Sequence, residues 1–357
     1  MHTRPIMEIN LTTICENYTF IKNHIHPITA ACVLKNNAYG LGIEQIGRAL
    51  YDHGCHTFFV AYGCEGQQLK QVAPNSCIYV LQGFGEEERS FFQQADLIPV
   101  LPTQLAIDNW FKNPANMQHP AIQVETGLHR LGLDLNEAKQ IAHLPVSLIL
   151  SHLACADECQ HYLNEKQKNT LLQFKSVFPN TPFSLSASDG VFLGRDFHFD
   201  MVRLGAALYG INTTPYEEKK VKNCLKITAP ILQIKTVTAG ETIGYSATYT
   251  VKRPTKIATV SIGYADGIFR NFQENGVLHI QAENTLFKAP VIGRVSMDNI
   301  MCDVSNIPEN ILNNTQYMTL IDDFYDLDAF GADCKTIGYE VLNNLGHASR
   351  YERRYIK

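Results

Sequence analysis

Residues 30–42 read AACVLKNNAYGLG, and the rest of the chain can be interpreted from this stretch outward. Small and apolar residues typical of a buried strand lead to Lys35, a polar turn with two glycines follows, and residues 43–50 have a helical pattern. A lysine at the end of a buried strand is partly desolvated, which lowers its pKa and makes a neutral amine available as a nucleophile. The alternative is a solvated surface charge, which is the usual situation of a lysine.

The size and charge of the chain limit the classes of protein to which it can belong. It has 357 residues, of which 45% are hydrophobic and 18% charged, enough for two hydrophobic cores. A formal net charge of −5 and the lack of a basic block argue against nucleic acid or an anionic membrane as a partner. Because no apolar run is long enough for a signal peptide or a bilayer span, we expect a cytoplasmic protein.

The ten cysteines are scattered along the chain, and we expect them to be reduced core residues. Two histidines and two cysteines fall within residues 152–161, which raises the alternative of a zinc site. Their spacing differs from that of paired zinc ligands, so we expect no bound metal.

The first 210 residues alternate short apolar runs with helix-like stretches. Eight strand candidates can be counted, which favours a (β/α)8 barrel over a doubly wound sheet. The candidates are 30–34, 57–61, 78–81, 97–101, 121–124, 146–150, 183–185 and 207–210, with helix candidates at 86–94, 103–111, 136–142 and 163–178. We therefore predict an α/β protein whose N-terminal (β/α)8 barrel covers residues 10–215.

A second, mainly β domain is predicted for residues 216–357. Residues 215–220 (PYEEKK) are polar and charged, as in a linker. The β-rich runs that follow lie at 225–238, 242–251, 256–262, 276–280, 286–291, 300–304 and 318–321, and a helix-like stretch at 336–345 precedes a basic tail. We expect residues 1–9 to join this domain.

The stretch 30–42 resembles the signature of the alanine racemases, in which an apolar strand delivers a lysine that carries pyridoxal phosphate. The resemblance extends over nearly the whole chain. It implies that Lys35 carries this cofactor, that Tyr39 contacts the cofactor phosphate, and that Gly40 and Gly42 let the backbone turn away beneath it.

Further barrel segments resemble family motifs, namely VETGLHRLG (124–132), SHLACAD (151–157), SLSAS (184–188) and MVRLGAALYG (201–210). The resemblance implies that Arg130 bonds the phenolic oxygen of the cofactor and helps hold the substrate carboxylate, and that His152 stands by the pyridine ring. Ser188 would bind the phosphate. Arg203 would face the ring nitrogen, with Gly205 also at the cofactor. From the residues alone, a surface arginine, a core histidine and a helix-capping serine are the alternatives.

Three details of these segments affect the implied chemistry. Ala187 stands where the family motif has asparagine, so only the adjacent serine is carried over. An arginine at position 203 stays charged and keeps the ring nitrogen unprotonated, which favours racemisation over transamination. Gln123 stands where many family members have a carbamylated lysine, seven residues before Arg130, so another group must hold this arginine.

The β domain contains four more segments that resemble family motifs: GYSATY (244–249), IGYADG (262–267), GRVSMD (293–298) and SRYER (349–353). They imply that Tyr245 is the second base, that Tyr264 and Met297 line the substrate site, and that Tyr351 bonds the phosphate. Tyr264 lies nineteen residues after Tyr245, the spacing of the family. Cross-strand packing is the alternative for each tyrosine.

A racemase needs two acid–base groups on opposite faces of the α-carbon, because one face loses a proton while the other gains one. The resemblance implies Lys35 and Tyr245 for these roles, in a homodimer whose β domains complete the barrel sites of their partners. We expect a pyridoxal-phosphate-dependent racemase that interconverts L- and D-alanine and supplies D-alanine for peptidoglycan. A racemase of broader amino-acid range and a non-catalytic pyridoxal-phosphate-binding protein are the alternatives.

Overall fold

The computed structural model describes residues 3–113, 117–212, 221–282 and 285–357, and these divide into two units. One unit contains Ile14–Ala38 and Gly42–Val221. The other contains the residues up to Thr13, the short segment Tyr39–Leu41, and Lys222–Lys357. The predicted linker at 215–220 lies outside the described residues.

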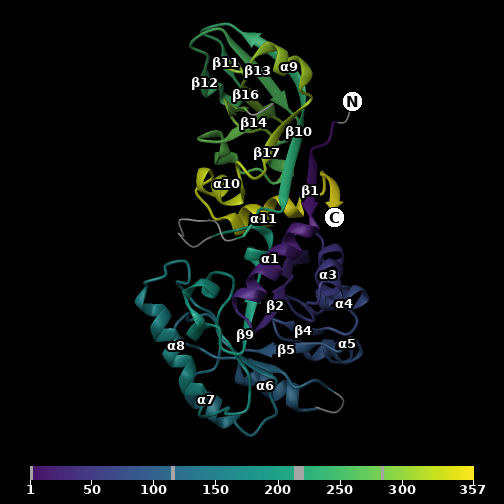
Figure 1. Cartoon of the computed structure of the whole chain (residues 1–357), viewed down its shortest axis with the longest axis vertical. Helices are drawn as coiled ribbons and strands as arrows, with labels where there is room; N and C mark the ends of the chain where they lie inside the picture. The colour runs from purple at the N-terminus through teal and green to yellow at the C-terminus, as the bar shows by residue number, and fades with distance from the viewer. Residues whose placement is uncertain (1–2, 114–116, 213–220, 283–284) are drawn as a thin grey trace. The chain divides into compact units, whose positions relative to one another are not determined.

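The first unit is the predicted eight-stranded parallel barrel (Figure 1). Its strands follow the order β8-β7-β6-β5-β4-β3-β2-β9, and a bridge between Ala187 and Arg203 joins the two ends of this order. The strands are β2 (Thr29–Val33), β3 (Thr57–Val60), β4 (Cys77–Val80), β5 (Ile98–Leu101), β6 (Ala121–Gln123), β7 (Leu148–Leu150), β8 (Phe183–Ser184) and β9 (Met201–Leu204).

Helices surround these strands, and most of them bury an apolar face against the barrel. They are α1 (Leu11–His24), α3 (Ile43–Asp52), α4 (Gly63–Val72), α5 (Arg89–Gln94), α6 (Gln104–Phe111), α7 (Leu135–Gln140) and α8 (Tyr162–Phe174). In α3, for example, Ile43, Ile46 and Leu50 are buried on one face. Alternate strand residues, such as Ala31 and Val33 of β2, fill the barrel interior, so the barrel is a packed core.

The prediction of the eighth strand was wrong. The strand is Met201–Leu204, and the predicted residues 207–210 lie largely in a 3-10 turn, η4 (Ala206–Tyr209). Both segments are buried, but the backbone leaves the extended region at Gly205, where φ is −116° and ψ is −97°. Arg203 lies within this strand, whereas the predicted strand began four residues after it. Its charged side chain is buried, and it interrupts the apolar pattern from which a buried strand is predicted.

The second unit is mainly β, as predicted. Its sheet has the order β15-β14-β17-β10-β1-β18, and β13 joins β10 to β16. The strands are β1 (Ile6–Asn10), β10 (Leu225–Val237), β13 (Thr255–Val260), β14 (Val277–Ala282), β15 (Thr285–Pro290), β16 (Ile300–Asp303), β17 (Tyr317–Ile321) and β18 (Glu352–Ile356). The N-terminal strand β1 pairs with β10 on one side and with β18 on the other.

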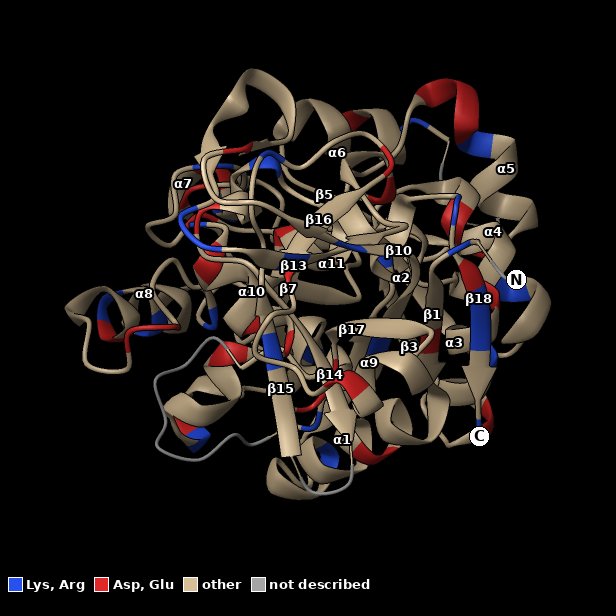
Figure 2. Ribbon diagram, turned by 90° about the horizontal axis from the view of Figure 1, so that it is seen from above, with Lys and Arg blue, Asp and Glu red and all other residues tan. Residues whose placement is uncertain are grey.

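Several elements of the second unit differ from the prediction. Residues 242–251 form two short strands, β11 (Thr242–Ile243) and β12 (Tyr249–Thr250), separated by the 3-10 turn η5 (Tyr245–Ala247). The basic tail is the edge strand β18, whose basic residues are blue in Figure 2. Helix α11 (Gly338–His347) was predicted, whereas α9 (Glu309–Asn314) and α10 (Leu327–Asp333) were not. None of the described helices is long and apolar enough to cross a membrane.

Candidate active site

Lys35 lies just beyond the carboxyl end of β2, the end at which barrel enzymes carry their active sites. The four residues that follow, Asn36 to Tyr39, all have positive φ, between 53° and 56°. A run of non-glycine residues in this region is strained, so neighbouring contacts must hold it. Asn37 supplies two of them: its N–H donates to Glu65 Oε1 at 2.9 Å, and its Oδ1 accepts from the Ile43 N–H at 2.8 Å.

The pKa of Lys35 is lowered, in the direction expected from its position at the end of a strand. Lys35 as a whole residue is exposed, but desolvation of its amine by the surrounding strand ends is the largest cause of the shift. The positive charges of Arg130 and Arg203 act in the same direction, whereas Glu65 opposes them. These effects place Lys35 and the two arginines in one electrostatic environment at the carboxyl ends of the barrel strands. The amine of Lys35 is therefore easier to deprotonate than that of a lysine in water.

Arg203 is buried inside the barrel, and its guanidinium group is held by oxygen and nitrogen atoms of neighbouring strands. Its Nη2 donates to the Ser151 carbonyl at 2.6 Å and to the Leu185 carbonyl at 3.2 Å, and lies 3.4 Å from His152 Nδ1. Its Nη1 donates to Ser184 Oγ at 2.5 Å. Burial lowers the pKa of Arg203 to about 10, so this arginine remains a cation at neutral pH.

His152 follows β7, and its imidazole is surrounded by cations. Burial lowers its pKa to about 3, and the charges of Arg203, Arg130 and Lys35 contribute in that order. His152 is therefore neutral at pH 7, and its ring nitrogen beside Arg203 serves as an acceptor. The structure brings Lys35, Arg130, His152 and Arg203 together at one end of the barrel.

Arg130 lies in the loop that follows β6, and it is exposed. The base of this loop is fixed by Gln123, whose backbone carbonyl accepts from the Leu133 N–H at 3.0 Å. The side chain of Gln123 donates from Nε2 to the Leu131 carbonyl, also at 3.0 Å. The residue that replaces the family lysine is therefore bonded to the backbone next to Arg130.

Ser188 and Gly205 are brought together where β8 and β9 end. Ser188 Oγ accepts from the N–H groups of Gly205, at 3.0 Å, and Ala207, at 3.2 Å. Ser188 makes no side-chain cap hydrogen bond to the turn that it opens, η2 (Asp189–Leu193), so the capping alternative considered for this serine is wrong there. Its hydroxyl instead bonds the start of η4. A hydroxyl that accepts two bonds keeps its own proton for donation.

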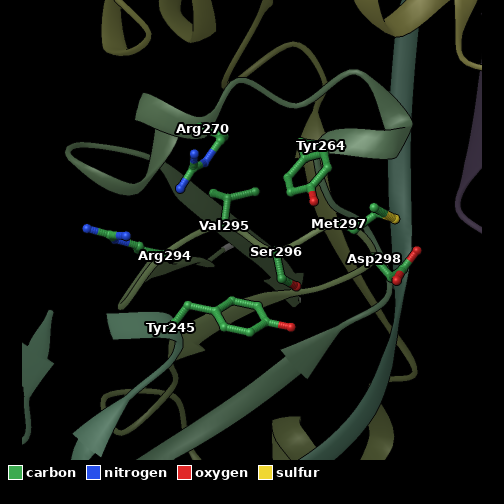
Figure 3. Close-up of a pocket in the computed structure, with 8 residues that line it drawn as sticks. All are labelled: Tyr245, Tyr264, Arg270, Arg294, Val295, Ser296, Met297 and Asp298. Atoms are coloured by element: carbon green, nitrogen blue, oxygen red, sulfur yellow. The ribbon is translucent and has the colours of Figure 1, made fainter. Parts of the chain in front are cut away.

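The other sequence-predicted residues lie in the unit that contains the β sheet, where a pocket of about 420 Å³ is lined by Tyr245, Tyr264, Arg270, Arg294, Val295, Ser296, Met297 and Asp298. Figure 3 shows Tyr245 and Tyr264 on opposite sides of Ser296, with the two arginines at one end and Met297 and Asp298 at the other. Tyr245 is 71% exposed and Met297 52% exposed, which is unusual for side chains of this size.

Two turns that carry pocket residues are bonded to each other. The Tyr264 N–H donates to the Ser296 carbonyl at 3.0 Å, and the Ala265 N–H donates to the Met297 carbonyl at 3.1 Å. A Cβ at Gly263 would lie 2.4 Å from the Met297 carbonyl oxygen, so this close approach requires glycine. The geometry fixes Tyr264 and Met297 relative to each other.

Arg350 links the same turns through their carboxylates. Its Nη1 donates to Asp298 Oδ1 at 2.8 Å, and its Nε lies 3.3 Å from Oδ1 of the buried Asp266 as an ion pair without hydrogen-bond alignment. Burial raises the pKa of Asp266, although the Gly263 N–H and the charge of Arg350 oppose this effect.

Tyr39 and Tyr351 are both buried. Gly40, beside Tyr39, approaches α11 so closely that a Cβ there would lie 2.5 Å from the Gly346 carbonyl carbon. The Tyr351 hydroxyl donates to the Asp266 carbonyl at 2.8 Å. Because a phenol has one proton to donate, this bond does not favour the phosphate contact predicted for Tyr351.

Sequence reasoning missed some residues of these sites. Glu65, which holds the turn after Lys35 and opposes the lowering of its pKa, was recognisable only as an acidic residue in a helical first turn. Arg294 and Asp298 belong to the quoted segment 293–298, but no role was assigned to them. Arg270 follows a turn with no distinctive pattern, so its place in the pocket had no signal in the sequence.

Two family models match nearly the whole chain in succession. The model described as "Alanine racemase, N-terminal domain" matches residues 9–213, and the model described as "Alanine racemase, C-terminal domain" matches residues 224–355. The chain belongs to the alanine racemase family. It is therefore a racemase, which is an isomerase by reaction class.

Individual alanine racemases match over nearly their full lengths. The alanine racemase of Rickettsia peacockii (strain Rustic) is 38% identical over 361 residues, which cover 98% of either chain. The biosynthetic alanine racemase of Agrobacterium fabrum is 36% identical and covers 98% of this chain and 93% of its own. Among solved structures, the alanine racemase from Bartonella henselae with covalently bound pyridoxal phosphate has a TM-score of 0.91 at 34% identity, covering 99% of this chain and 100% of its own.

Proposed function

We propose that the chain is a pyridoxal-phosphate-dependent racemase that interconverts L-alanine and D-alanine. The observation that carries this proposal is the group of Lys35, Arg130, His152 and Arg203 at one end of the barrel, where desolvation and, after it, the arginine charges lower the pKa of Lys35. The names of its relatives support alanine as the substrate, and the Bartonella henselae structure supports the cofactor.

The donor set of the barrel fits an anionic cofactor. Three cationic or basic groups, Lys35, Arg130 and Arg203, share one environment, and no carboxylate bonds Arg203 among the hydrogen bonds described for its guanidinium group. Ser188 adds a hydroxyl donor. A phosphate and a phenolic oxygen would balance this positive charge. We assign Lys35 as the covalent attachment point, Ser188 and Gly205 to the phosphate side, Arg130 to the phenolic oxygen and Arg203 to the ring nitrogen.

Tyr39 and Tyr351 are assigned different roles in this proposal. Tyr39 follows Lys35 by four residues on the same left-handed turn, and we assign it to the phosphate as well. For Tyr351 we propose a structural role, because its hydroxyl proton is given to Asp266.

Bound pyridoxal phosphate supplies an electron sink that makes the α-proton of an amino acid acidic. The residues of the chain then have to remove and return that proton. Arg203 keeps its charge at neutral pH and so keeps a proton off the ring nitrogen, while neutral His152 accepts beside it. This arrangement limits delocalisation into the ring and disfavours protonation away from the α-carbon, which is the transamination route.

Two groups of the chain exchange protons with the α-carbon in this proposal. Lys35 acts on one face, with a lowered pKa that makes its neutral amine accessible. Tyr245 acts on the other face, and Tyr264 and Met297 line the same pocket as Tyr245. Arg130 binds the substrate carboxylate.

The active unit in this proposal is a homodimer with shared sites. Lys35 and Tyr245 belong to different units of the chain, and the Tyr245 pocket leaves large side chains exposed. The β domain of one subunit would cover these side chains by completing the barrel site of the other. We place the enzyme in the cytoplasm, supplying D-alanine for peptidoglycan.

The test of the proposed function is an assay of the purified, cofactor-loaded protein against a panel of single-enantiomer amino acids. We expect either enantiomer of alanine to reach the same racemic mixture, with much slower reaction of larger amino acids. Equal rates across the panel would favour the broader racemase, and cofactor binding without any racemisation would favour the non-catalytic binding protein.

A further inference from the structure

Gln167, in the middle of α8, is a fully buried polar side chain that the proposed mechanism does not use. Its Oε1 accepts from the Ala154 N–H at 2.8 Å. Its Nε2 donates to the His152 carbonyl at 2.9 Å and to Thr126 Oγ1 at 3.2 Å. A buried amide with both ends bonded is costly to disturb, because each partner would be left without a hydrogen bond.

These bonds join the two loops that carry site residues. Thr126 lies in the loop after β6, four residues before Arg130, whereas His152 and Ala154 lie in the loop after β7. The same helix also packs on the first loop, since a Cβ at Gly127 would lie 3.4 Å from Gln167 Cγ. One side chain of α8 thus contacts both loops.

The connection continues to the buried arginine of the barrel. Thr126 Oγ1 and Ser151 Oγ are 2.8 Å apart, and the Ser151 carbonyl accepts from Arg203 Nη2 at 2.6 Å. Thr126 and Ser151 are both buried, so water does not compete for these bonds. This series of hydrogen bonds therefore connects Gln167 to Arg203, whose Nη2 lies 3.4 Å from His152 Nδ1.

We infer that Gln167 is a positioning residue of the racemase site, which sets the separation between the Arg130 loop and His152. This inference rests on the proposed function for the roles of Arg130 and His152. Gln167 has no contact with the reacting atoms in this assignment. It acts by holding the two loops at a fixed separation. Its loss should therefore affect kcat, the rate at which bound substrate is turned over.

The test compares Gln167→Met with Asn164→Leu. Methionine has a similar length but no polar atoms, so it removes all three bonds. Asn164 is a matched control, because it is a buried amide one turn earlier on α8. Its Nδ2 donates to the carbonyls of Cys155 and Glu158, at 3.0 Å each, and these described bonds reach none of the three partners of Gln167. The first readout is hydrogen exchange of residues 125–133 in the cofactor-free protein. The second is kcat and KM of the loaded enzyme, per mole of folded protein.

We expect Gln167→Met to exchange faster in residues 125–133 and to lower kcat by about tenfold or more, as expected for a misplaced site group. Asn164→Leu should leave exchange in residues 125–133 and kcat within a factor of about two of the wild type, although both variants lose thermal stability. A third variant, Gln167→Glu, keeps the acceptor for Ala154 and regains a donor when protonated. Its kcat relative to the wild type should therefore rise as the pH falls.

Unchanged exchange in residues 125–133 of Gln167→Met would overturn the inference, and so would equal losses of kcat in Gln167→Met and Asn164→Leu. The two proposals fail separately. A wild-type protein that does not racemise alanine removes the proposed function, and the exchange measurement then still decides whether Gln167 holds the loops.

Discussion

Arg203 Nη2 lies 3.4 Å from His152 Nδ1, so a buried cation faces an imidazole inside the barrel. Arg203 belongs to β9, and His152 follows the end of β7 by two residues. The Ser151 carbonyl holds the guanidinium group by accepting from Arg203 Nη2 at 2.6 Å. The charge of Arg203 adds to burial in lowering the pKa of His152 to about 3. This relationship gives the barrel a neutral histidine next to a permanent cation.

The neutral state of His152 predicts how stability depends on pH. Between pH 6.5 and about 3, an unfolded chain binds a proton at this histidine and the folded chain does not. The stabilisation from neutral His152 is therefore fully present above pH 6.5 and is lost progressively as the pH falls toward 3. In the cofactor-free protein, His152→Gln should reduce the slope of the unfolding free energy against pH by up to about 1.4 kcal/mol per unit in this range.

Urea denaturation between pH 4 and 7 measures this slope. His143→Gln, which removes an exposed histidine from the same unit, controls for general effects of losing an imidazole. Identical slopes for wild type and His152→Gln would show that His152 takes up a proton in the folded protein, which is incompatible with a neutral imidazole beside Arg203.

Gln123 predicts that activity does not depend on bicarbonate. An amide cannot be carbamylated, and the Gln123 side chain donates to the Leu131 carbonyl at 3.0 Å next to Arg130. Removing carbon dioxide, or adding bicarbonate, should leave kcat unchanged, whereas Gln123→Lys offers an amine that bicarbonate can modify. Wild-type activity that falls on carbon dioxide removal and returns with bicarbonate would refute the assignment of this position.

Tyr245→Phe should impair the two directions of proton removal unequally. Because Lys35 remains, exchange of the α-proton of D-alanine should continue, whereas exchange from L-alanine should fall by about 100-fold or more, as for the loss of a general base. Mass spectrometry of each enantiomer in deuterated water measures both rates. Equal losses would contradict the assignment of the two faces.

Two inactive variants should restore activity to each other if the sites are shared between subunits. In a mixed dimer of Lys35→Ala and Tyr245→Phe, one site has both defects and the other has none. With random mixing, half of the dimers are mixed and each has one intact site, so about a quarter of wild-type activity should return. Activity that stays at the level of the separate variants after verified subunit exchange would indicate sites built within one chain.

Much of the barrel could be predicted because its strands are short apolar runs with regular spacing. The eighth strand was predicted at the wrong residues, because Arg203 interrupts the apolar pattern of the true strand, whereas the buried turn at 206–209 has the pattern of an apolar run. Strand β18 was taken for a basic tail, since an edge strand can carry charged residues where a central strand cannot. Edge position depends on pairing with β1, more than 300 residues earlier, and no local pattern reports it.

The residues of the candidate site also differ in how well they could be predicted from the sequence. Residues at strand ends, such as Lys35 and His152, were recognisable from motifs, and the geometry adds their charges and contacts. Tyr351 also stood in a motif, but its bond to the Asp266 carbonyl depends on a turn 85 residues away. Gln167 was not recognisable, because an amide on a helix is usually solvated and only the packed barrel shows that it is buried.

The most direct test of the proposed function is a paired measurement on the wild type and Lys35→Ala, each incubated with pyridoxal phosphate and then with L-alanine. Visible absorbance reports covalent attachment of the cofactor, and chiral chromatography reports the formation of D-alanine. We predict both signals for the wild type and neither for Lys35→Ala. A Lys35→Ala protein that retained both signals, or a wild type that bound the cofactor without forming D-alanine, would contradict the proposed function.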